Sequence, residues 1–286
     1  MKGIYCLLIV FGFLHAGAQT DYGKLGQVFR IGSPHSMFPD SVRNKEPRVY
    51  QGKTFSAAEH YSDSSAFVFV PAYFDKSKPF HFVLWFHGWG NCIDTALKQF
   101  QLVEQFSEAH QNAIFVFPEG PKQAPDSYAG KFEQPKQFDL FMQDVQGFLQ
   151  KEKTITARQP NDLVLAGHSG AYRAISYILL HTNRITSGVF LFDALYGEEE
   201  KFAMQLQKNP ACKFIDIYTD NGGTMQNSKD LMVDMDAWKW KYVQLEEDAC
   251  EAADLKNNRF IFLHSKKAHN DVITNNNNFE RFLKSL

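Results

Sequence analysis

Ser169 lies where the sequence changes from an apolar strand to a helix, and its close neighbours are small. Gly167 and Ala171 stand two residues before it and two after it, and the apolar run 163–166 precedes them. A sharp strand-to-helix turn strains the backbone of its central residue, so only small residues fit at these two positions. The turn raises the hydroxyl at a helix N-terminus, where the helix dipole favours negative charge. We therefore predict a nucleophilic serine, against the alternative of a glycine-rich turn with an incidental serine.

A general base for this serine is expected in the loop after the last strand. His269 lies beyond the strand predicted over 259–263, at the edge where the carboxyl ends of the strands meet. His264 ends that strand, where packing is the simpler role, and the turn should direct His168 away from the hydroxyl. Surface exposure without a catalytic role is the alternative for His269.

Two aspartates could orient this histidine. Asp220 follows the strand predicted over 213–218, in a Gly-rich and Asn-rich segment that a solvated turn explains fully. Asp193 follows the strand predicted over 188–192 and is embedded in apolar residues, where an ionised carboxylate needs a partner. A histidine that becomes cationic during catalysis would be that partner. The sequence favours Asp193, with Asp220 as the alternative acid, and both give the chain order serine, acid, histidine.

A turn upstream of the serine adds a fourth motif. The strand predicted over 80–86 continues into the sequence HGWG at residues 87–90. A tight turn at the end of a strand would explain the His-Gly pair on its own. However, strand–His-Gly, strand–serine–helix, strand–aspartate and strand–histidine follow one another in this order over residues 80–275.

This order of motifs resembles the α/β-hydrolase superfamily. The serine turn reads GHSGA at 167–171, where the family commonly has G-x-S-x-G, and the departure keeps the small residues. The resemblance implies that the main-chain N–H groups of Trp89 and Gly170 form an oxyanion hole. Within the superfamily the chain is similar to small secreted esterases of the polyhydroxybutyrate-depolymerase and feruloyl-esterase type, through HGWGN at 87–91, FPEG at 117–120 and the serine turn.

The chemistry that these residues predict is hydrolysis of an acyl bond through an acyl-enzyme, most simply in an ester of a small molecule or a polymer. An amidase or peptidase would use the same triad, and a non-catalytic binding protein could share the fold. The pocket is expected at the carboxyl ends of the strands, with walls from Trp89, the loop 119–132, the turn 194–197 and the insertion 220–258. The sequence assigns no residue to substrate specificity.

The elements that must position these residues follow from short apolar runs and helical periodicity. Strands are predicted at 80–86, 113–117, 162–166, 188–192, 213–218 and 259–263, mostly apolar on both faces, as in a covered parallel sheet. Helices are predicted between them, over 97–106 after a cap at Asp94, over 138–148 and over 171–180. The alternation predicts an α/β fold with a mostly parallel central sheet flanked by helices.

Two regions depart from this alternation. Residues 54–60 and 65–70 are predicted to pair as an N-terminal antiparallel hairpin, and residues 19–50 to wrap the surface. The irregular segment 220–258 contains a helix with Leu231, Met235 and Trp238 expected on one face. That helix is either an ordinary packed helix or part of a flap that shapes the substrate site.

The N-terminal segment predicts export. Lys2, the apolar run 3–14 and the small residues at 16–18 form a signal peptide, 1–18, cleaved after Ala18. The run is short for a membrane anchor. We therefore expect a secreted or periplasmic protein in which residues 19–286 form a single domain.

Composition narrows the partners. The net charge is −2 and no basic block is present, so the chain lacks the electrostatic pattern of a nucleic-acid-binding protein. No CxxC pair or HExxH motif is present, so neither a metal nor another cofactor is expected. Of the cysteines left after processing, Cys212 and Cys250 are expected to form a disulfide, because Cys92 lies beside the predicted site. The oligomeric state stays open.

Overall fold

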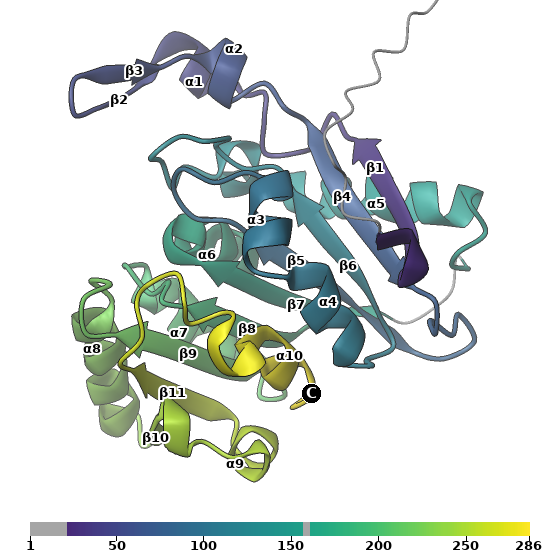
Figure 1. Cartoon of the computed structure of the whole chain (residues 1–286). Coiled ribbons are helices and arrows are strands. Elements are labelled where there is room, and N and C mark those ends of the chain that lie inside the picture. The colour runs from purple at the N-terminus through teal and green to yellow at the C-terminus, as the bar shows by residue number, and fades with distance from the viewer. Residues whose placement is uncertain (1–21, 157–160) are drawn as a thin grey trace, which may run out of the picture.

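The computed structural model describes residues 22–156 and 161–286, and a nine-stranded sheet runs through this part of the chain (Figure 1). Its order is β1-β4-β6-β5-β7-β8-β9-β11-β10. The strands from β6 to β10 in this order are parallel, and β4 and β1 are antiparallel to their neighbours. The strand bounds are β1 Gly26–Gly32, β4 Ser65–Pro71, β5 Phe80–Phe86, β6 Ala113–Pro118, β7 Asn161–His168, β8 Thr186–Phe192, β9 Lys213–Thr219, β10 Val243–Glu246 and β11 Phe260–Ser265.

Helices cover both faces of the sheet. The longer ones are α3 Ile93–Gln99, α4 Leu102–Glu108, α5 Gln137–Lys151, α6 Tyr172–His181, α7 Glu199–Lys208, α8 Met225–Ala237, α9 Ala252–Asn257 and α10 Asn278–Leu283, and the short ones are α1 Ser41–Lys45, α2 Ala57–His60 and the 3-10 turns η1 Tyr22–Lys24, η2 Gly130–Glu133, η3 Ser169–Ala171, η4 Glu247–Ala249 and η5 Asn275–Asn277. Apolar residues of α5 to α8 pack on one face, and those of α3, α4, α9 and α10 pack on the other.

The two faces are built by alternation along each strand. In β5, Phe82 and Leu84 enter one hydrophobic cluster, and Val83 and Trp85 enter the other, all fully buried. A strand that buries both faces has no polar side, which is why these runs read as continuously apolar. Each buried side chain of this size contributes roughly 1.5–3 kcal/mol relative to an exposed one. The six predicted strands are all present, and the mostly parallel sheet flanked by helices is confirmed.

The helix predicted over 97–106 is interrupted. Gln101 has a φ of 50°, in the left-handed region, and it separates α3 from α4. The first helix begins after Cys92, and the predicted cap Asp94 lies inside it, where its carboxylate pairs with Arg30 of β1. Apolar residues at a spacing of three continue across the break because both short helices pack on the same face of the sheet.

An N-terminal antiparallel hairpin is present, but the two segments expected to form it do not pair with each other. The hairpin consists of β2 (Arg48–Tyr50) and β3 (Lys53–Phe55), joined by Gln51 and Gly52 with positive φ. Residues 57–60 form α2, and β4 lies between β1 and β6, with which it pairs. The strand β1 comes from the segment expected to wrap the surface, so β4 already has partners on both edges.

The insertion 220–258 contains one packed helix and one edge strand. Leu231 and Met235 of α8 are buried against the core, as expected. Trp238 lies beyond the helix end and is 44% exposed, so its expected place on the buried face is wrong. Farther along, β10 pairs in parallel with β11 and ends the sheet.

The predicted disulfide between Cys212 and Cys250 is contradicted. Both thiols are free and buried, as is that of Cys92. Cys212 belongs to the hydrophobic cluster on one face of the sheet and Cys250 to the cluster on the other, so the sheet separates them. Burial raises the pKa of the Cys212 thiol to about 12, which keeps it in the unreactive protonated form.

Two expectations concern the N-terminus and the membrane. The predicted signal peptide, residues 1–18, lies outside the described residues. Among the helices of residues 22–156 and 161–286, none combines the length and the apolar character that crossing a bilayer requires.

Candidate active site

The predicted nucleophile sits on a strained turn. β7 ends at His168, and Ser169 has a φ of 57° before the 3-10 turn η3 leads into α6. A left-handed backbone is unusual for a serine and is costly unless the surroundings enforce it. They do so here by close packing, because a Cβ atom on Gly167 would lie 2.6 Å from the Cβ of Ala171, and one on Gly88 would lie 2.5 Å from the Cβ of Ser169. The small residues predicted from the sequence are therefore required by contact.

His269 and Asp193 are brought together across the sheet edge. His269 Nδ1 lies 2.6 Å from Asp193 Oδ2, a short hydrogen bond of the kind that an ionised carboxylate accepts. The Asp193 side chain is completely buried, and that of His269 is 32% exposed. Asp193 has a φ of 47° at the end of β8, so this turn is also strained. The buried carboxylate thus has the imidazole partner that its apolar surroundings demand.

Hydroxyl groups complete the environment of Asp193. Thr219 donates to Oδ2 from its hydroxyl at 2.7 Å and to Oδ1 from its main-chain N–H at 3.2 Å, and the Thr224 hydroxyl donates to Oδ1. Burial acts to raise the pKa of Asp193, but the hydrogen bonds from His269, Thr224 and Thr219 outweigh it and lower the pKa below its usual value. The carboxylate is therefore ionised at neutral pH.

The alternative acid, Asp220, has another partner. Its Oδ1 lies 2.8 Å from His264 Nε2, and Glu246 Oε1 lies 2.9 Å from the other ring nitrogen of His264. The hydrogen bond to Glu246 raises the pKa of His264 most, burial opposes it, and the hydrogen bond to Asp220 adds to the rise. The two aspartates thus contact two different histidines, and only Asp193 contacts His269.

His168 contacts both the ring and the main chain of His269. It is buried, its ring centroid lies 4.4 Å from that of His269, and its Nε2 donates to the His269 carbonyl at 3.0 Å. Burial, followed by the proximity of His269, lowers the pKa of His168 to about 3, so this ring stays neutral. Its bond to the His269 carbonyl holds the loop that carries His269.

Tyr196 and Ser169 line the same cavity, and the Tyr196 hydroxyl donates to the Gly222 carbonyl. Burial and the charge of Asp193 raise the pKa of Tyr196 to about 12, with the nearby Ser169 hydroxyl opposing them. Within the described part of the chain no hydrogen bond joins Ser169 to His269; the bonds of His269 are those to Asp193 and His168. Such bonds are commonly loose in an enzyme without substrate.

The turn at residues 87–90 packs directly on the serine turn. A Cβ atom on Gly170 would lie 2.6 Å from Trp89 Cδ1, so the indole ring covers this glycine. Among the described residues, none accepts a hydrogen bond from the main-chain N–H of Trp89 or of Gly170. Gly170 belongs to the first turn of a helix, where N–H groups have no partner within the helix. Two free main-chain donors therefore lie next to Ser169.

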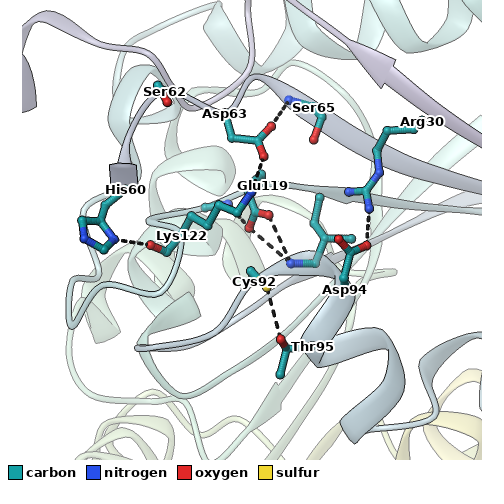
Figure 2. Close-up of polar contacts among 12 residues, drawn as sticks. Arg30, His60, Ser62, Asp63, Ser65, Cys92, Asp94, Thr95, Glu119 and Lys122 are labelled. Carbon is teal, nitrogen blue, oxygen red and sulfur yellow. Dashed lines mark hydrogen bonds and ion pairs between the residues drawn. The ribbon is translucent and has the colours of Figure 1, made fainter. Parts of the chain in front are cut away.

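A buried pair fixes this turn. His87 Nε2 lies 3.0 Å from Glu119 Oε1, and His87 Nδ1 donates to the Gly88 carbonyl at 2.7 Å. The Glu119 carboxylate also accepts from the N–H of Ile93, the first residue of α3, at 3.2 Å (Figure 2). The HG and PEG sequences identified as motifs are thus in contact, and together they connect the turn to α3.

A cavity of about 240 Å³ opens beside the serine. It is lined by Trp89, Ser127, Ser169, Gly170, Tyr172 and Tyr196. Three of the predicted walls contribute: the Trp89 turn, the loop 119–132 and the turn 194–197. Tyr172 was not predicted, although its place three residues after the nucleophile at the start of α6 could have indicated it. The insertion 220–258 contributes no lining residue, so its predicted role as a wall is wrong for this cavity.

Two other features of the described residues bear on ligands. A larger cavity of about 710 Å³ lies between α7 and α8 and contains none of the predicted site residues, whereas Ser169, Trp89 and Gly170 line the smaller one. Among residues 22–156 and 161–286, no group of three or more histidine, cysteine, aspartate or glutamate side chains is placed to hold a metal ion.

Asp216 is another buried carboxyl near the site, and the sequence analysis did not identify it. It lies on β9 opposite Leu191, its Oδ2 accepts from the Ser228 hydroxyl at 2.6 Å, and among the described residues its Oδ1 has no partner. Burial raises the pKa of Asp216 to about 7, with Ser228 opposing this and the charge of Asp193 adding to it. A lone aspartate in an otherwise apolar strand was the available signal.

Asp216→Asn is expected to change how stability depends on pH. The folded-state pKa of about 7 lies above the ordinary value of 3.8, so between these values the folded state binds more protons. The free energy of unfolding therefore falls as pH rises, with a slope approaching about 1.4 kcal/mol per pH unit from this group. An amide does not titrate, so the variant should lack this contribution and gain stability relative to the native chain as pH rises. Urea unfolding between pH 4 and 8 measures it.

The control for this measurement is Asp234→Asn, on the exposed side of the same helix as Ser228. It should keep the slope of the native chain. An equal slope in Asp216→Asn and the native chain would show that Asp216 does not titrate in this range.

Solved structures share this architecture. The feruloyl esterase module from Clostridium thermocellum, complexed with sinapinate, aligns with a TM-score of 0.52 and 13% identity over 92% of this chain and 88% of that one. Fluorophosphonate-binding serine hydrolase F of Staphylococcus aureus aligns with a TM-score of 0.50 and 12% identity over 91% of this chain and 97% of that one. A ferulic acid esterase aligns with a TM-score of 0.50 and 14% identity over 77% and 90%. No protein-family model and no curated protein matches the chain. The molecule has the α/β-hydrolase fold.

Proposed function

We propose that this protein is a serine hydrolase that cleaves a carboxylic ester, with Ser169 as nucleophile, His269 as general base and Asp193 as the acid that orients it. The observation that carries the proposal is the 2.6 Å contact between His269 Nδ1 and the buried Asp193 carboxylate, beside a serine held in a left-handed conformation. A carboxylate on Nδ1 leaves Nε2 of the same ring to take a proton from the serine.

The reaction would proceed in two halves. Ser169 Oγ attacks the ester carbonyl carbon as its proton passes to His269 Nε2, and the main-chain N–H groups of Trp89 and Gly170 stabilise the oxyanion. The carbonyl then re-forms, the ester bond breaks, and the leaving alcohol takes the proton from His269. Water next attacks the acyl-enzyme with His269 again as base, which releases the acid and restores Ser169. These steps involve no metal or other cofactor.

Two observations support an ester as the substrate. The cavity walls are aromatic and hold Tyr172, Tyr196 and Trp89, which suit an apolar acyl or alcohol group. The structural neighbours with TM-scores of 0.50 or more include proteins described as feruloyl or ferulic acid esterases.

The apolar segment 3–14 and the small residues that follow support export, and we place the enzyme outside the cytoplasm.

A fluorophosphonate probe tests the proposal, because such a probe reacts covalently with a serine that is activated by a base and an oxyanion hole. The purified protein should gain the mass of one adduct, and Ser169→Ala should gain none. The same intact mass reports whether residues 1–18 have been removed. An unlabelled wild-type protein with a native thermal transition would overturn the proposal.

A further inference from the structure

The Ser127 side chain lines the cavity, and its hydroxyl accepts one hydrogen bond but donates none within the described part of the chain. Trp89 Nε1 lies 2.7 Å from Ser127 Oγ. An indole N–H is a donor and never an acceptor, so Ser127 accepts this bond and its own proton must point elsewhere. In the part of the chain that the structure describes, no residue accepts that proton. The cavity therefore contains a side-chain donor that the mechanism above does not use.

The Ser127 hydroxyl lies next to the oxyanion site. A Cβ atom on Gly170 would lie 2.7 Å from Ser127 Oγ, so the hydroxyl is in contact with the residue whose main-chain N–H is proposed to bind the oxyanion. Ser127, Gly170 and Ser169 line the same cavity. An ester carbonyl oxygen bound by the Gly170 N–H next to Ser169 would therefore lie in the cavity that Ser127 also lines.

Contacts on both sides of Ser127 hold it in place. The Asp126 carboxylate pairs with Arg43 Nη2 at 2.8 Å and accepts from the Tyr61 hydroxyl at 3.0 Å. The Tyr128 hydroxyl donates to Asp40 at 2.6 Å. Both neighbours of Ser127 in the chain are buried and bonded to the segment 40–61, which leaves the serine little freedom to move.

The start of the same loop is anchored as well. Lys122 Nζ lies 3.0 Å from Asp63 Oδ2, and His60 Nδ1 donates to the Lys122 carbonyl at 2.7 Å (Figure 2). The loop is therefore fixed at two points by residues that precede β4. A donor held in this way stabilises charge without reorganising during the reaction, which is the condition for a large catalytic effect.

We propose that the Ser127 hydroxyl donates a third hydrogen bond to the oxyanion, beside the N–H groups of Trp89 and Gly170. This inference rests on the proposed ester hydrolysis at Ser169. The indole N–H of Trp89 orients the hydroxyl by occupying one of its lone pairs, and the loop anchors set its distance. Ser127 is thus assigned as a catalytic residue that touches the reacting carbonyl oxygen.

The matched pair Ser127→Thr and Ser127→Val tests this assignment, because the two side chains have the same shape and differ in the hydroxyl. With p-nitrophenyl acetate, the valine variant should lose about 10²- to 10³-fold in kcat relative to the threonine variant, as is typical of removing one oxyanion donor. KM should change little, because the bond strengthens as charge develops in the transition state. A boronic acid that forms a tetrahedral adduct with Ser169 should bind more weakly to the valine variant by a similar factor.

The outcomes separate this inference from the proposed function. Wild-type protein that neither hydrolyses the ester nor takes up the fluorophosphonate overturns the function itself. Equal kcat values for the threonine and valine variants, in a protein whose wild type is active, overturn only the role of Ser127. A loss confined to KM would also overturn it, because it would assign Ser127 to binding of the ground state. The thermal transitions of the two variants check that both are folded.

Discussion

Ser169→Ala is expected to lower kcat for p-nitrophenyl acetate by about 10⁶-fold, the order found when the nucleophile of a serine triad is removed. His269 and Asp193 stay in place but have no hydroxyl to activate. The main-chain donors at Trp89 and Gly170 remain, so a residual rate of about 10³- to 10⁴-fold over water is expected. Initial rates at saturating ester measure the effect.

Ser77→Ala is the matched control for this variant. Ser77 lies in the turn before β5, at the amino ends of the parallel strands and so at the opposite edge of the sheet from the cavity. Its rate should equal that of the wild type. A rate near that of the wild type in Ser169→Ala would remove Ser169 from the reaction and, with it, the acyl-enzyme mechanism.

The central strands could be predicted because they are buried on both faces, and such strands appear in the sequence as short apolar runs. In β5 every residue except His81 is apolar, and β8 ends in an unbroken apolar run from Val189 to Phe192. Short apolar runs of this kind between polar turns are typical of buried strands. β1 was missed because it lies at the edge of the sheet. Its residues alternate in exposure and include Arg30, so no apolar run marks it.

The hairpin and the broken helix show where local patterns fail. Residues 65–70 have a clear strand pattern, but this pattern does not show which strand they pair with. In the structure β4 pairs with β1 on one edge and with β6 on the other. Similarly, the spacing of Phe100, Val103 and Phe106 is helical whether or not the helix is continuous. The left-handed Gln101 that divides it has no feature that distinguishes it in the sequence.

The candidate site could be predicted where its residues follow strands and could not where they meet across the fold. Asp193 and His269 are 76 residues apart, and both were predicted because each stands in the loop that follows a strand. Ser127 and Tyr196 lie in loops whose contacts with the serine turn arise only when the strands assemble. A local pattern records which side chains leave the sheet at that edge, but not which of them enter the cavity.

Asp193→Asn is expected to lower kcat by about 10⁴-fold, the effect of placing an amide behind a catalytic histidine. The hydrogen bonds from His269, Thr224 and Thr219 keep the pKa of Asp193 low despite burial, so the native group is a carboxylate that accepts from Nδ1. An amide nitrogen can instead donate to Nδ1, which puts the ring proton on Nε2. That tautomer cannot accept a proton from Ser169, whereas the size of the side chain is unchanged.

The matched variant is Asp220→Asn, which makes the same chemical change at the other aspartate. Asp220 contacts His264 and not His269, so its kcat should remain near that of the wild type. The ratio of the two kcat values, measured with the same ester, decides between the two acids. Differences in assay conditions cancel in this ratio. A greater loss in Asp220→Asn would contradict the assignment of Asp193 and would require His264 to replace His269 as the base. That exchange is disfavoured by the structure, because both ring nitrogens of His264 already face carboxylates and neither is free to accept a proton from a serine.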